Sequence, residues 1–254
     1  MRMVAAIAIA AGLSISAQFG AAPADAAEIR ALVSNALKST MEEAVPQFEK
    51  ASGHKLTVTF GAAAELKDSI EKGTPVDVAI LTTATTDDLV KEGKLVAAGR
   101  VDIARAGAGV AARKGTPKPD ISTTAGFKQA LLDAKSIAYV GAGATAPYIK
   151  SLFDRLGIAD QVQSKLKVQP TSNPAAKAVA NGEAELGITQ ISEILPYAGA
   201  ELVGPLPPEL QLYTVYPAAL AADTKEAEAA KALIKFLMSA DTIAVLKSKG
   251  LSPG

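Results

Sequence analysis

The chain has 254 residues, and its 26 lysines and arginines balance its 26 aspartates and glutamates, so the formal net charge at pH 7 is zero. This balance excludes the strongly basic surface with which proteins bind nucleic acid or an anionic membrane. The absence of cysteine excludes disulfides, thiol nucleophiles and thiolate metal sites.

The first residues have the pattern of a signal peptide. Arg2 precedes an apolar run, Met3–Ala17, and small residues then lead to Ala24-Asp25-Ala26. The run is too short to cross a bilayer, although an uncleaved anchor is the alternative. We expect residues 1–26 to be removed. The mature chain has no cysteine for a lipid anchor, so we expect export to a soluble compartment without insertion into the membrane.

Strands and helices alternate in the next part of the chain. Three strand–helix units in series predict a parallel sheet covered by helices. The expected strands are Ile29–Val33, Lys55–Phe60 and Val76–Leu81. The expected helices run from Ser34 or Asn35 to about Ala51, over Glu65–Lys72, and from a cap at Thr85 or Thr86 through Glu92.

A second series follows an extended stretch, Ile103–Arg113, and a loop, Lys114–Asp120. Its expected helices are Phe127–Ala134, Pro147–Leu156, Ala175–Asn181 and Ile191–Tyr197, and its expected strands are Ile137–Val140, Leu166–Gln169 and Leu186–Gln190. A loop, Gly204–Leu210, leads to a second extended stretch, Gln211–Ala219. Two helices, Lys225–Met238 and Thr242–Lys249, end the chain.

The two series predict an α/β protein of two lobes joined by two crossover strands, with a ligand cleft between the lobes. Lobe 1 would comprise 27–105 and 216–254, and lobe 2 would comprise 106–215. A simple tandem of two domains is the alternative. In either arrangement a ligand is expected at the carboxyl ends of the strands.

One strand-end loop resembles a dinucleotide-binding motif. Gly141–Ala146 reads G-x-G-x-x-A between a strand and a helix, but Gly107–Ala112 matches the same string by composition alone. The next strand, Lys165–Gln169, lacks the acid that would bind a ribose. The weaker interpretation is a glycine-rich turn at a helix N-terminus, where free N–H groups can meet an anion.

The search for catalytic groups gives no mechanism. The one histidine, His54, precedes a strand in what reads as a solvated turn, and Ser69–Lys72 lacks the partner motifs of a β-lactamase. The adjacent acids Glu42-Glu43 and Asp87-Asp88 point to different sides of their helices. We therefore expect a protein that is not an enzyme and that uses no cofactor and no metal.

The strand-end loops are instead short, uncharged and rich in small polar residues. They lead directly into helices, whose N-termini offer N–H donors and a positive dipole end, so they suit a small anion. The alternative is that each of these serines, threonines and asparagines, taken singly, is an ordinary helix N-cap. The loops are Ser34-Asn35-Ala36, Gly61–Ala64, Thr82-Thr83, Gly141–Pro147, Thr171-Ser172-Asn173 and Thr189-Gln190.

Several stretches resemble the molybdate-binding protein family of bacterial periplasmic solute-binding proteins. "TFGAAAELKDSIEKGTPVDVAILTT", 59–83, is similar to that family's small-residue loop, helix, Gly-x-Pro-x-Asp turn and buried strand. "SNALKSTMEEAVPQFEKASG", 34–53, and "ANGEAELGITQISE", 180–193, resemble its opening loop and helix and a strand of its second lobe. The resemblance implies a periplasmic binding protein of the type II fold with two lobes, which delivers its ligand to the permease of an ABC importer in the inner membrane.

The resemblance also implies ligand positions. The family's serine of the first loop maps to Ala36, beside Ser34 and Asn35, and its serine run in the second loop maps to Ala62-Ala63-Ala64. Its backbone donors map to Thr145 and Ser172, and a tyrosine maps to Gln190. The predicted ligand residues are Ser34, Asn35, Ala36, Ala63, Thr145, Ser172 and Gln190.

Ala36 and Ala63 lack the hydroxyls that the family's serines would offer to an oxyanion, and this affects which ligand we expect. Two missing hydrogen bonds to a charged group, each worth roughly 1.5–3 kcal/mol, would weaken oxyanion binding by about two to four orders of magnitude. The ligand is expected to be a small anion, either a molybdate-type oxyanion or a small organic carboxylate. We expect a monomer that does not bind nucleic acid. There are two alternatives: an exported ligand-binding protein that serves a membrane sensor, and an exported enzyme on the same fold.

Overall fold

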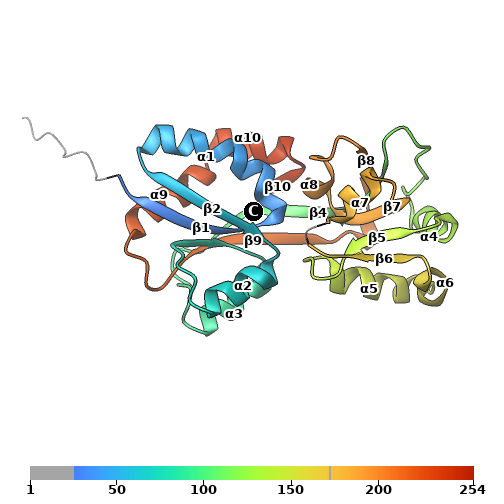
Figure 1. The fold of residues 1–254 in the computed structure, drawn as a ribbon, viewed down its shortest axis with the longest axis horizontal. Helices are drawn as coiled ribbons and strands as arrows, with labels where there is room; N and C mark the ends of the chain where they lie inside the picture. Colours follow the sequence, from blue (N-terminus) through green and yellow to red (C-terminus); the bar gives the residue numbers. More distant parts are fainter. Residues whose placement is uncertain (1–25, 172) are drawn as a thin grey trace, which may run out of the picture.

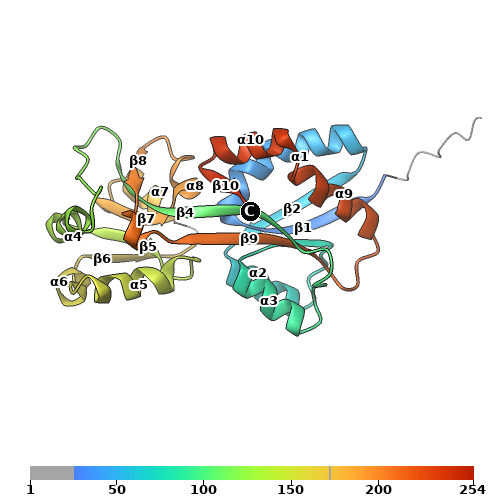
Figure 2. The ribbon, with the colours of Figure 1, turned by 180° about the vertical axis from the view of Figure 1, so that it is seen from behind.

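The computed structural model describes residues 26–171 and 173–254. It consists of two α/β lobes, with two long strands running between them (Figure 1, Figure 2). The predicted signal peptide lies outside the described residues except for Ala26. In the part of the chain that is described, no helix is both long enough and apolar enough to cross a membrane.

The elements follow the predicted alternation of strands and helices. The strands are β1 (Glu28–Ser34), β2 (Lys55–Gly61), β3 (Val78–Ile80), β4 (Val101–Arg113), β5 (Ile137–Val140), β6 (Leu166–Gln169), β7 (Leu186–Gln190), β8 (Ala200–Pro205), β9 (Tyr213–Leu220) and β10 (Leu251–Pro253). The helices are α1 (Lys38–Ser52), α2 (Ala63–Glu71), α3 (Thr83–Lys91), α4 (Thr124–Asp133), α5 (Ala146–Arg155), α6 (Ala159–Gln163), α7 (Ala175–Ala180), α8 (Ile191–Ile194), α9 (Ala227–Leu237) and α10 (Ala240–Ser248), with 3-10 turns η1 (Asn35–Leu37) and η2 (Pro208–Leu210).

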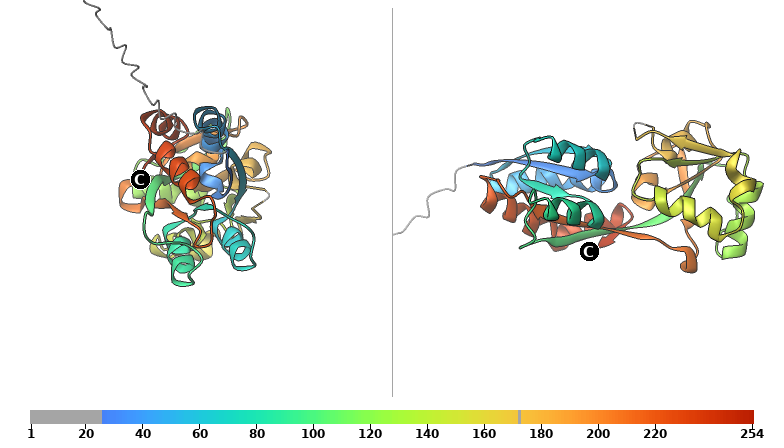
Figure 3. Two further views of the ribbon diagram at one scale, coloured as in Figure 1. Left: turned by 90° about the vertical axis from the view of Figure 1, so that its left-hand side faces the viewer. Right: turned by 90° about the horizontal axis from the view of Figure 1, so that it is seen from below.

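Strands β4 and β9 join the lobes. The strand order is β2-β1-β3-β9-β4-β7-β5-β6, with β8 and β10 also paired with β4. β4 pairs with β9 up to Gly107 and with β7 from Ala108 onward, so it leaves one lobe and enters the other without a break. The same strand contains the Gly107–Ala112 string, which is therefore extended backbone and not a phosphate-binding turn. Figure 3 shows both strands crossing between the lobes.

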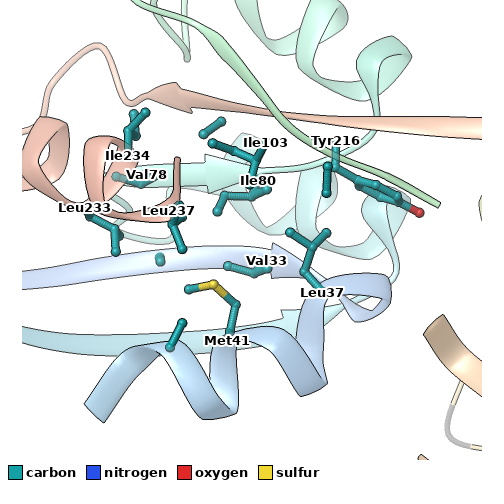
Figure 4. Packing of buried hydrophobic residues seen from close by; sticks show 14 of the residues in the cluster. Val33, Leu37, Met41, Val78, Ile80, Ile103, Tyr216, Leu233, Ile234 and Leu237 are labelled. Atoms are coloured by element: carbon teal, nitrogen blue, oxygen red, sulfur yellow. The ribbon is translucent and has the colours of Figure 1, made fainter. Parts of the chain in front are cut away.

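The first lobe packs helices on both faces of its sheet. α1, α9 and α10 cover one face, and α2 and α3 cover the other (Figure 1). In α1 the buried residues Met41, Ala44 and Phe48 recur at helical spacing and pack on β1 and β3, as Figure 4 shows for Met41, Val33 and Ile80. Burying each large side chain contributes about 1.5–3 kcal/mol, so this face ties the C-terminal helices to the N-terminal strands.

The second lobe is built in the same way from β4–β8. α4, α5 and α6 bury large side chains such as Phe127 and Leu152 on one face. α7 and α8 cover the other face with small residues, mostly alanine. A Cβ on Gly187 of β7 would lie 3.1 Å from Val179 Cγ2 and 3.2 Å from the Ala175 carbonyl oxygen, so α7 lies very close to the sheet.

Each lobe has its own hydrophobic cluster, and the residues of the two clusters indicate where the chain passes from one lobe to the other. The cluster of the first lobe includes Ala106 and Tyr216, and the cluster of the second lobe begins at Ala108 and ends at Leu210. The division predicted from the sequence, after 105 and after 215, remains a proposal.

The structure corrects three details of the predicted elements. Helix α3 is capped by Thr82, whose side chain accepts a hydrogen bond from the Thr85 amide, and not by Thr85 or Thr86. Strand β8 occupies part of the predicted loop at Gly204–Leu210, because its residues pair with β4. The short elements α6 and β10 were not predicted, since so few residues carry little periodicity.

Candidate functional site

A cavity of about 500 Å³ lies between the lobes, at the carboxyl ends of the parallel strands. Its lining includes the residues that follow β1 and β2 in the first lobe and β5, β6 and β7 in the second. Because the two sets of strands point toward each other, the short loops after them meet across one space. This is the place where open α/β sheets bind their ligands.

The first loop contributes Ser34, Asn35 and Ala36, which form the end of β1 and the start of η1. Ser34 is 3 % exposed, and its hydroxyl has no hydrogen-bond partner among the described residues. Lys38 begins α1 and also lines the cavity, with its ammonium 3.8 Å from the Glu42 carboxylate. The first lobe therefore offers an unused hydroxyl and a positive charge.

The second loop contributes Gly61, Ala62 and Ala63, which have no side-chain hydroxyl. The Ala62 amide donates to Glu65 Oε2 at 3.2 Å, so one free donor of the α2 N-terminus is already occupied. A Cβ on Gly61 would lie 3.0 Å from Leu66 Cδ2, and this explains why the close turn into α2 has glycine there.

The second lobe contributes Gly143, Ala144 and Thr145 after β5, Thr171 after β6, and Lys177 from α7. Thr145 is 5 % exposed and precedes α5, and its side chain makes no capping hydrogen bond. Lys177 is exposed, so its ammonium adds a second positive charge to the cavity from the lobe opposite Lys38.

The cap residues that line the cavity differ from those elsewhere. Thr82, Thr123 and Ser239 lie outside the cavity lining, and each accepts a hydrogen bond from the amide three residues ahead. Ser34 and Thr145, at the same kind of position, make no such bond. Ordinary capping therefore explains the first group and does not explain the second, whose hydroxyls are left available to a ligand.

Strand β7 leads into α8, which carries an acidic side chain into the cavity. Glu193 lines the cavity, and the Thr189 hydroxyl donates a hydrogen bond to its carboxylate. Burial raises the pKa of Glu193, although hydrogen bonds from Thr189 and the Gln190 amide oppose the shift. The hydroxyl of Ser192 beside it is buried and has no partner among the described residues.

Tyr216 reaches the cavity from β9. Its ring packs in the core of the first lobe, and its hydroxyl points away from that core (Figure 4). The hydroxyl donates to Gln190 Oε1 at 2.8 Å, and Gln190 Nε2 is left without a partner among the described residues. Burial raises the pKa of the Tyr216 phenol, and the negative charge of Glu193 raises it further, so the phenol stays neutral.

The structure brings most of the predicted ligand residues together. Ser34, Asn35, Ala36, Ala63 and Thr145 line the cavity. Gln190 is 2 % exposed and does not line the cavity. It accepts a hydrogen bond from Tyr216, which does line the cavity. Ser172 lies outside the described residues. The roles of these residues in binding remain predictions.

The lining residues that the sequence prediction did not include comprise four with charged or phenolic side chains that bear on the chemistry: Lys38, Lys177, Glu193 and Tyr216. Lys38, Lys177 and Glu193 lie within the first turn or so of a helix that follows a strand-end loop. A search extended one helical turn beyond each loop would have found these three. Tyr216 has no such signal, because it lies within a crossover strand.

The cavity suits binding of an anion that carries some apolar surface. Its lining combines two lysines, two glutamates and several hydroxyls with the apolar surface of Val140, Pro174 and Pro196. No group of three or more histidines, aspartates or glutamates able to hold a metal ion occurs among residues 26–171 and 173–254.

Comparison with known proteins places the chain among bacterial binding proteins. The family model described as "Bacterial extracellular solute-binding protein" matches residues 29–252. The chain is 33 % identical to an aconitate isomerase from Pseudomonas sp, over 87 % of this chain and 86 % of the relative. It is 28 % identical to the molybdate-binding protein ModA of Azotobacter vinelandii, over 94 % and 95 % of the two chains.

The fold agrees with these relatives. The solved structure of the periplasmic molybdate-binding protein of Azotobacter vinelandii superposes with a TM-score of 0.75 at 19 % identity, covering 89 % of this chain and 99 % of that one. Such a likeness establishes the type II binding fold with two lobes. It leaves the ligand to be inferred from the cavity.

Proposed function

The chain belongs to the bacterial extracellular solute-binding protein family, and from this membership we propose that it binds a small organic carboxylate between its lobes and delivers it to an ABC importer. The predicted resemblance to the molybdate-binding proteins is confirmed, since these are among its relatives. The observation that carries the proposal is a cavity into which both lobes bring a lysine and a buried hydroxyl without a partner among the described residues, beside the two glutamates Glu42 and Glu193.

The two lysines of the cavity favour an anion, while its two acids, Glu42 and Glu193, carry the opposite charge. Lys38 and Lys177 come from opposite lobes, so an anion between them attracts both. Ser34 and Thr145 hold hydroxyls at the starts of helical turns, where backbone amides also point outward. A ligand that contacts both sides would hold the lobes together.

The small side chains favour an anion with a carbon skeleton. Ala36 and Ala63 give no hydroxyls to a tetrahedral oxyanion, and Val140, Pro174 and Pro196 offer apolar surface. The volume of about 500 Å³ lies in the range typical of sites for small organic molecules. An organic carboxylate uses both the charged and the apolar parts of this lining.

A panel of candidate ligands tests the proposal by thermal shift on the mature protein. The panel contains molybdate, tungstate, sulfate and phosphate beside small mono-, di- and tricarboxylates. A ligand at 100 times its dissociation constant adds about 2.7 kcal/mol to the free energy of unfolding, which gives a clear shift. We expect a carboxylate to give the largest shift. A larger shift with molybdate or tungstate would contradict the proposal.

Delivery to an importer is supported by the family and by the predicted export of the chain. A membrane sensor is the alternative receiver of the ligand. Reconstitution with the permease encoded nearest to the gene would test delivery, because transport of the panel's best ligand should depend on this protein.

An isomerase is the second candidate function. Most of the curated relatives are named as binding proteins, but one that covers 87 % of this chain is named aconitate isomerase. Aconitate is an unsaturated tricarboxylate, so both candidate functions require a carboxylate in the same cavity. They differ in whether the bound molecule leaves changed.

A further inference from the structure

Glu193 is the acidic group most enclosed by the cavity. It lies on α8, three residues after the end of β7, and the Thr189 hydroxyl fixes its carboxylate by a hydrogen bond. The other acid in the lining, Glu42, is 57 % exposed and lies 3.8 Å from Lys38, so water and a cation stabilise its charge. Of the two acids in the lining, only Glu193 has a carboxylate that is both fixed by a hydrogen bond and buried away from water.

The surroundings of Glu193 change the pKa of its carboxyl in the direction that favours proton transfer. Burial raises its pKa above the ordinary value of 4.5, so the carboxyl takes up a proton more readily than an exposed glutamate does. Tyr197 and Tyr216 are close enough for the charge of Glu193 to raise the pKa of both phenols. The remaining charged groups of the lining are Lys38, Glu42 and Lys177.

We propose that Glu193 carries a proton between two carbon atoms of an unsaturated carboxylate held in the cavity, so that the protein isomerises this ligand as well as binding it. The inference rests on the proposed function, since the carboxylate must first bind between the lobes. Lys38 and Lys177 then stabilise the negative charge that develops on the ligand's carboxylates as the proton leaves.

The reaction balances without a co-reactant. The Glu193 carboxylate takes a proton from the CH₂ group that lies between a carboxylate and the carbon–carbon double bond. The C–H electron pair forms a new double bond to the central carbon, and the electrons of the old double bond move to the far carbon. That carbon takes the proton back from Glu193. One proton moves, the double bond shifts by one position, and nothing is oxidised or reduced.

The product of this step on aconitate is again aconitate. The two carbons beside the central carbon, one CH₂ and one CH, each bear a carboxylate. The shift of the double bond exchanges these two carbons, so the product has the same bonds between the same groups as the substrate. The geometry about the new double bond follows from the conformation in which the cavity holds the molecule. A single base on one side of the ligand is therefore sufficient to interconvert the two geometric isomers.

A capping role alone would also place a glutamate at this position. The third residue of a helix often reaches back to the amide of the cap residue, and Glu193 does this with Gln190. Glutamine serves the cap equally well but cannot accept and return a proton. Glu193→Gln therefore separates the two roles.

The experiment uses trans-aconitate as the probe and the mature chain in three forms. These are the wild type, Glu193→Gln, and Glu228→Gln, which removes an exposed carboxylate from the first turn of α9 outside the cavity. Formation of the cis isomer is followed by proton NMR, and binding is followed by thermal shift. The rate for the wild type is also measured between pH 4 and pH 8.

We expect the wild type and Glu228→Gln to isomerise the probe, with a rate that rises as one group ionises above the ordinary pKa of glutamate. Glu193→Gln should bind trans-aconitate within about twofold of the wild type and lose about 100-fold or more in kcat. Binding without isomerisation by the wild type would overturn this inference and leave the proposed function standing. Wild-type turnover by Glu193→Gln would overturn the role of Glu193. Failure of every carboxylate to bind would overturn both proposals.

Discussion

The Thr171 hydroxyl donates a hydrogen bond of 2.7 Å to Glu65 Oε1, joining the loop after β6 to the first turn of α2 across the cavity. The other oxygen of Glu65 accepts from the Ala62 amide in the loop that lines the first lobe. One carboxylate therefore stabilises a ligand-facing turn and also contacts the opposite lobe.

The bond between Thr171 and Glu65 should favour the form in which the lobes are close together. Thr171→Val keeps the shape and removes the donor, and a hydrogen bond to a charged group is worth about 1.5 kcal/mol or more. Affinity for the panel's best ligand should fall about tenfold in calorimetry. Small-angle scattering should show a smaller decrease in radius of gyration on binding than for the wild type.

Thr57→Val provides the matched control for this change. Its hydroxyl also donates to a glutamate, Glu28, but both residues lie on strands of the same lobe. This variant should bind as the wild type does. Equal affinities of both variants and the wild type would show that the contact does not contribute to closure.

Lys177 should contribute to affinity by its charge. Lys177→Met keeps most of the side-chain length and removes the ammonium, so binding of a carboxylate should weaken about tenfold and become less sensitive to salt. Lys167→Met removes an exposed charge from β6 of the same lobe, outside the cavity lining, and serves as the control. Titrations at two salt concentrations decide the matter. An unchanged dissociation constant for Lys177→Met would exclude this lysine from the site.

Asp77 should stabilise the first lobe in a pH-dependent way. Its buried carboxylate accepts hydrogen bonds from the Arg30 side chain and amide and from Thr224. Burial alone would raise the pKa of Asp77, but these bonds outweigh it and the pKa is lowered from 3.8. Because the pKa is lower in the folded protein, the stabilisation is present above about pH 3.8 and is lost as the pH falls through the folded-state value.

Asp77→Asn tests this stabilisation. Arg30 is 45 % exposed, so water screens part of the ion pair, and we expect a loss of about 2–3 kcal/mol at pH 7. The difference from the wild type should begin to shrink below about pH 3.8, where the unfolded wild-type chain binds a proton at Asp77, and should be lost as the pH falls through the lowered folded-state pKa. Urea unfolding at pH 7 and at a series of pH values down to about pH 2 measures this dependence. A difference that does not depend on pH would contradict the assignment.

Gly109 should be required by the packing of the crossover strand β4. A Cβ there would lie 2.8 Å from Ile191 Cγ1 and 3.1 Å from the Gly204 carbonyl oxygen, so Gly109→Ala should cost about 1–3 kcal/mol in urea unfolding. Gly204→Ala on the neighbouring strand is the control, because the nearest atom would be 3.5 Å away. Equal stabilities of the two variants would refute the packing argument.

The predicted export can be checked on the protein itself. Ala24-Asp25-Ala26 predicts cleavage after Ala26, so the mature chain should begin at Ala27 and be released by osmotic shock. N-terminal sequencing of the released protein checks this. Recovery of the full-length chain from the cytosol would contradict it.

Much of the fold and part of the candidate site could be predicted from the sequence. β5, β6 and β7 have the predicted boundaries, because short β-branched runs between turn residues are local signals. The loops that contain Ser34 and Thr145 were found for the same reason, because turn residues mark where each strand ends, and the resemblance to the molybdate-binding proteins then singled out Thr145. Glu193 was not found, because an acid in the first turn of a short helix also fits an ordinary cap.

The sequence by itself determined the alternating order of strands and helices and the loops that can meet a ligand, and its resemblance to the molybdate-binding proteins implied the type II fold. Only the tertiary structure decided that β4 and β9 run between both lobes and that α9 and α10 return to pack with α1, because the pattern left a tandem of domains as an alternative. It also brought Tyr216 to Gln190 and left the hydroxyl of Ser34 without a partner. The physical reason is that hydrophobic periodicity specifies which face of an element is buried and does not specify against which distant element it is buried.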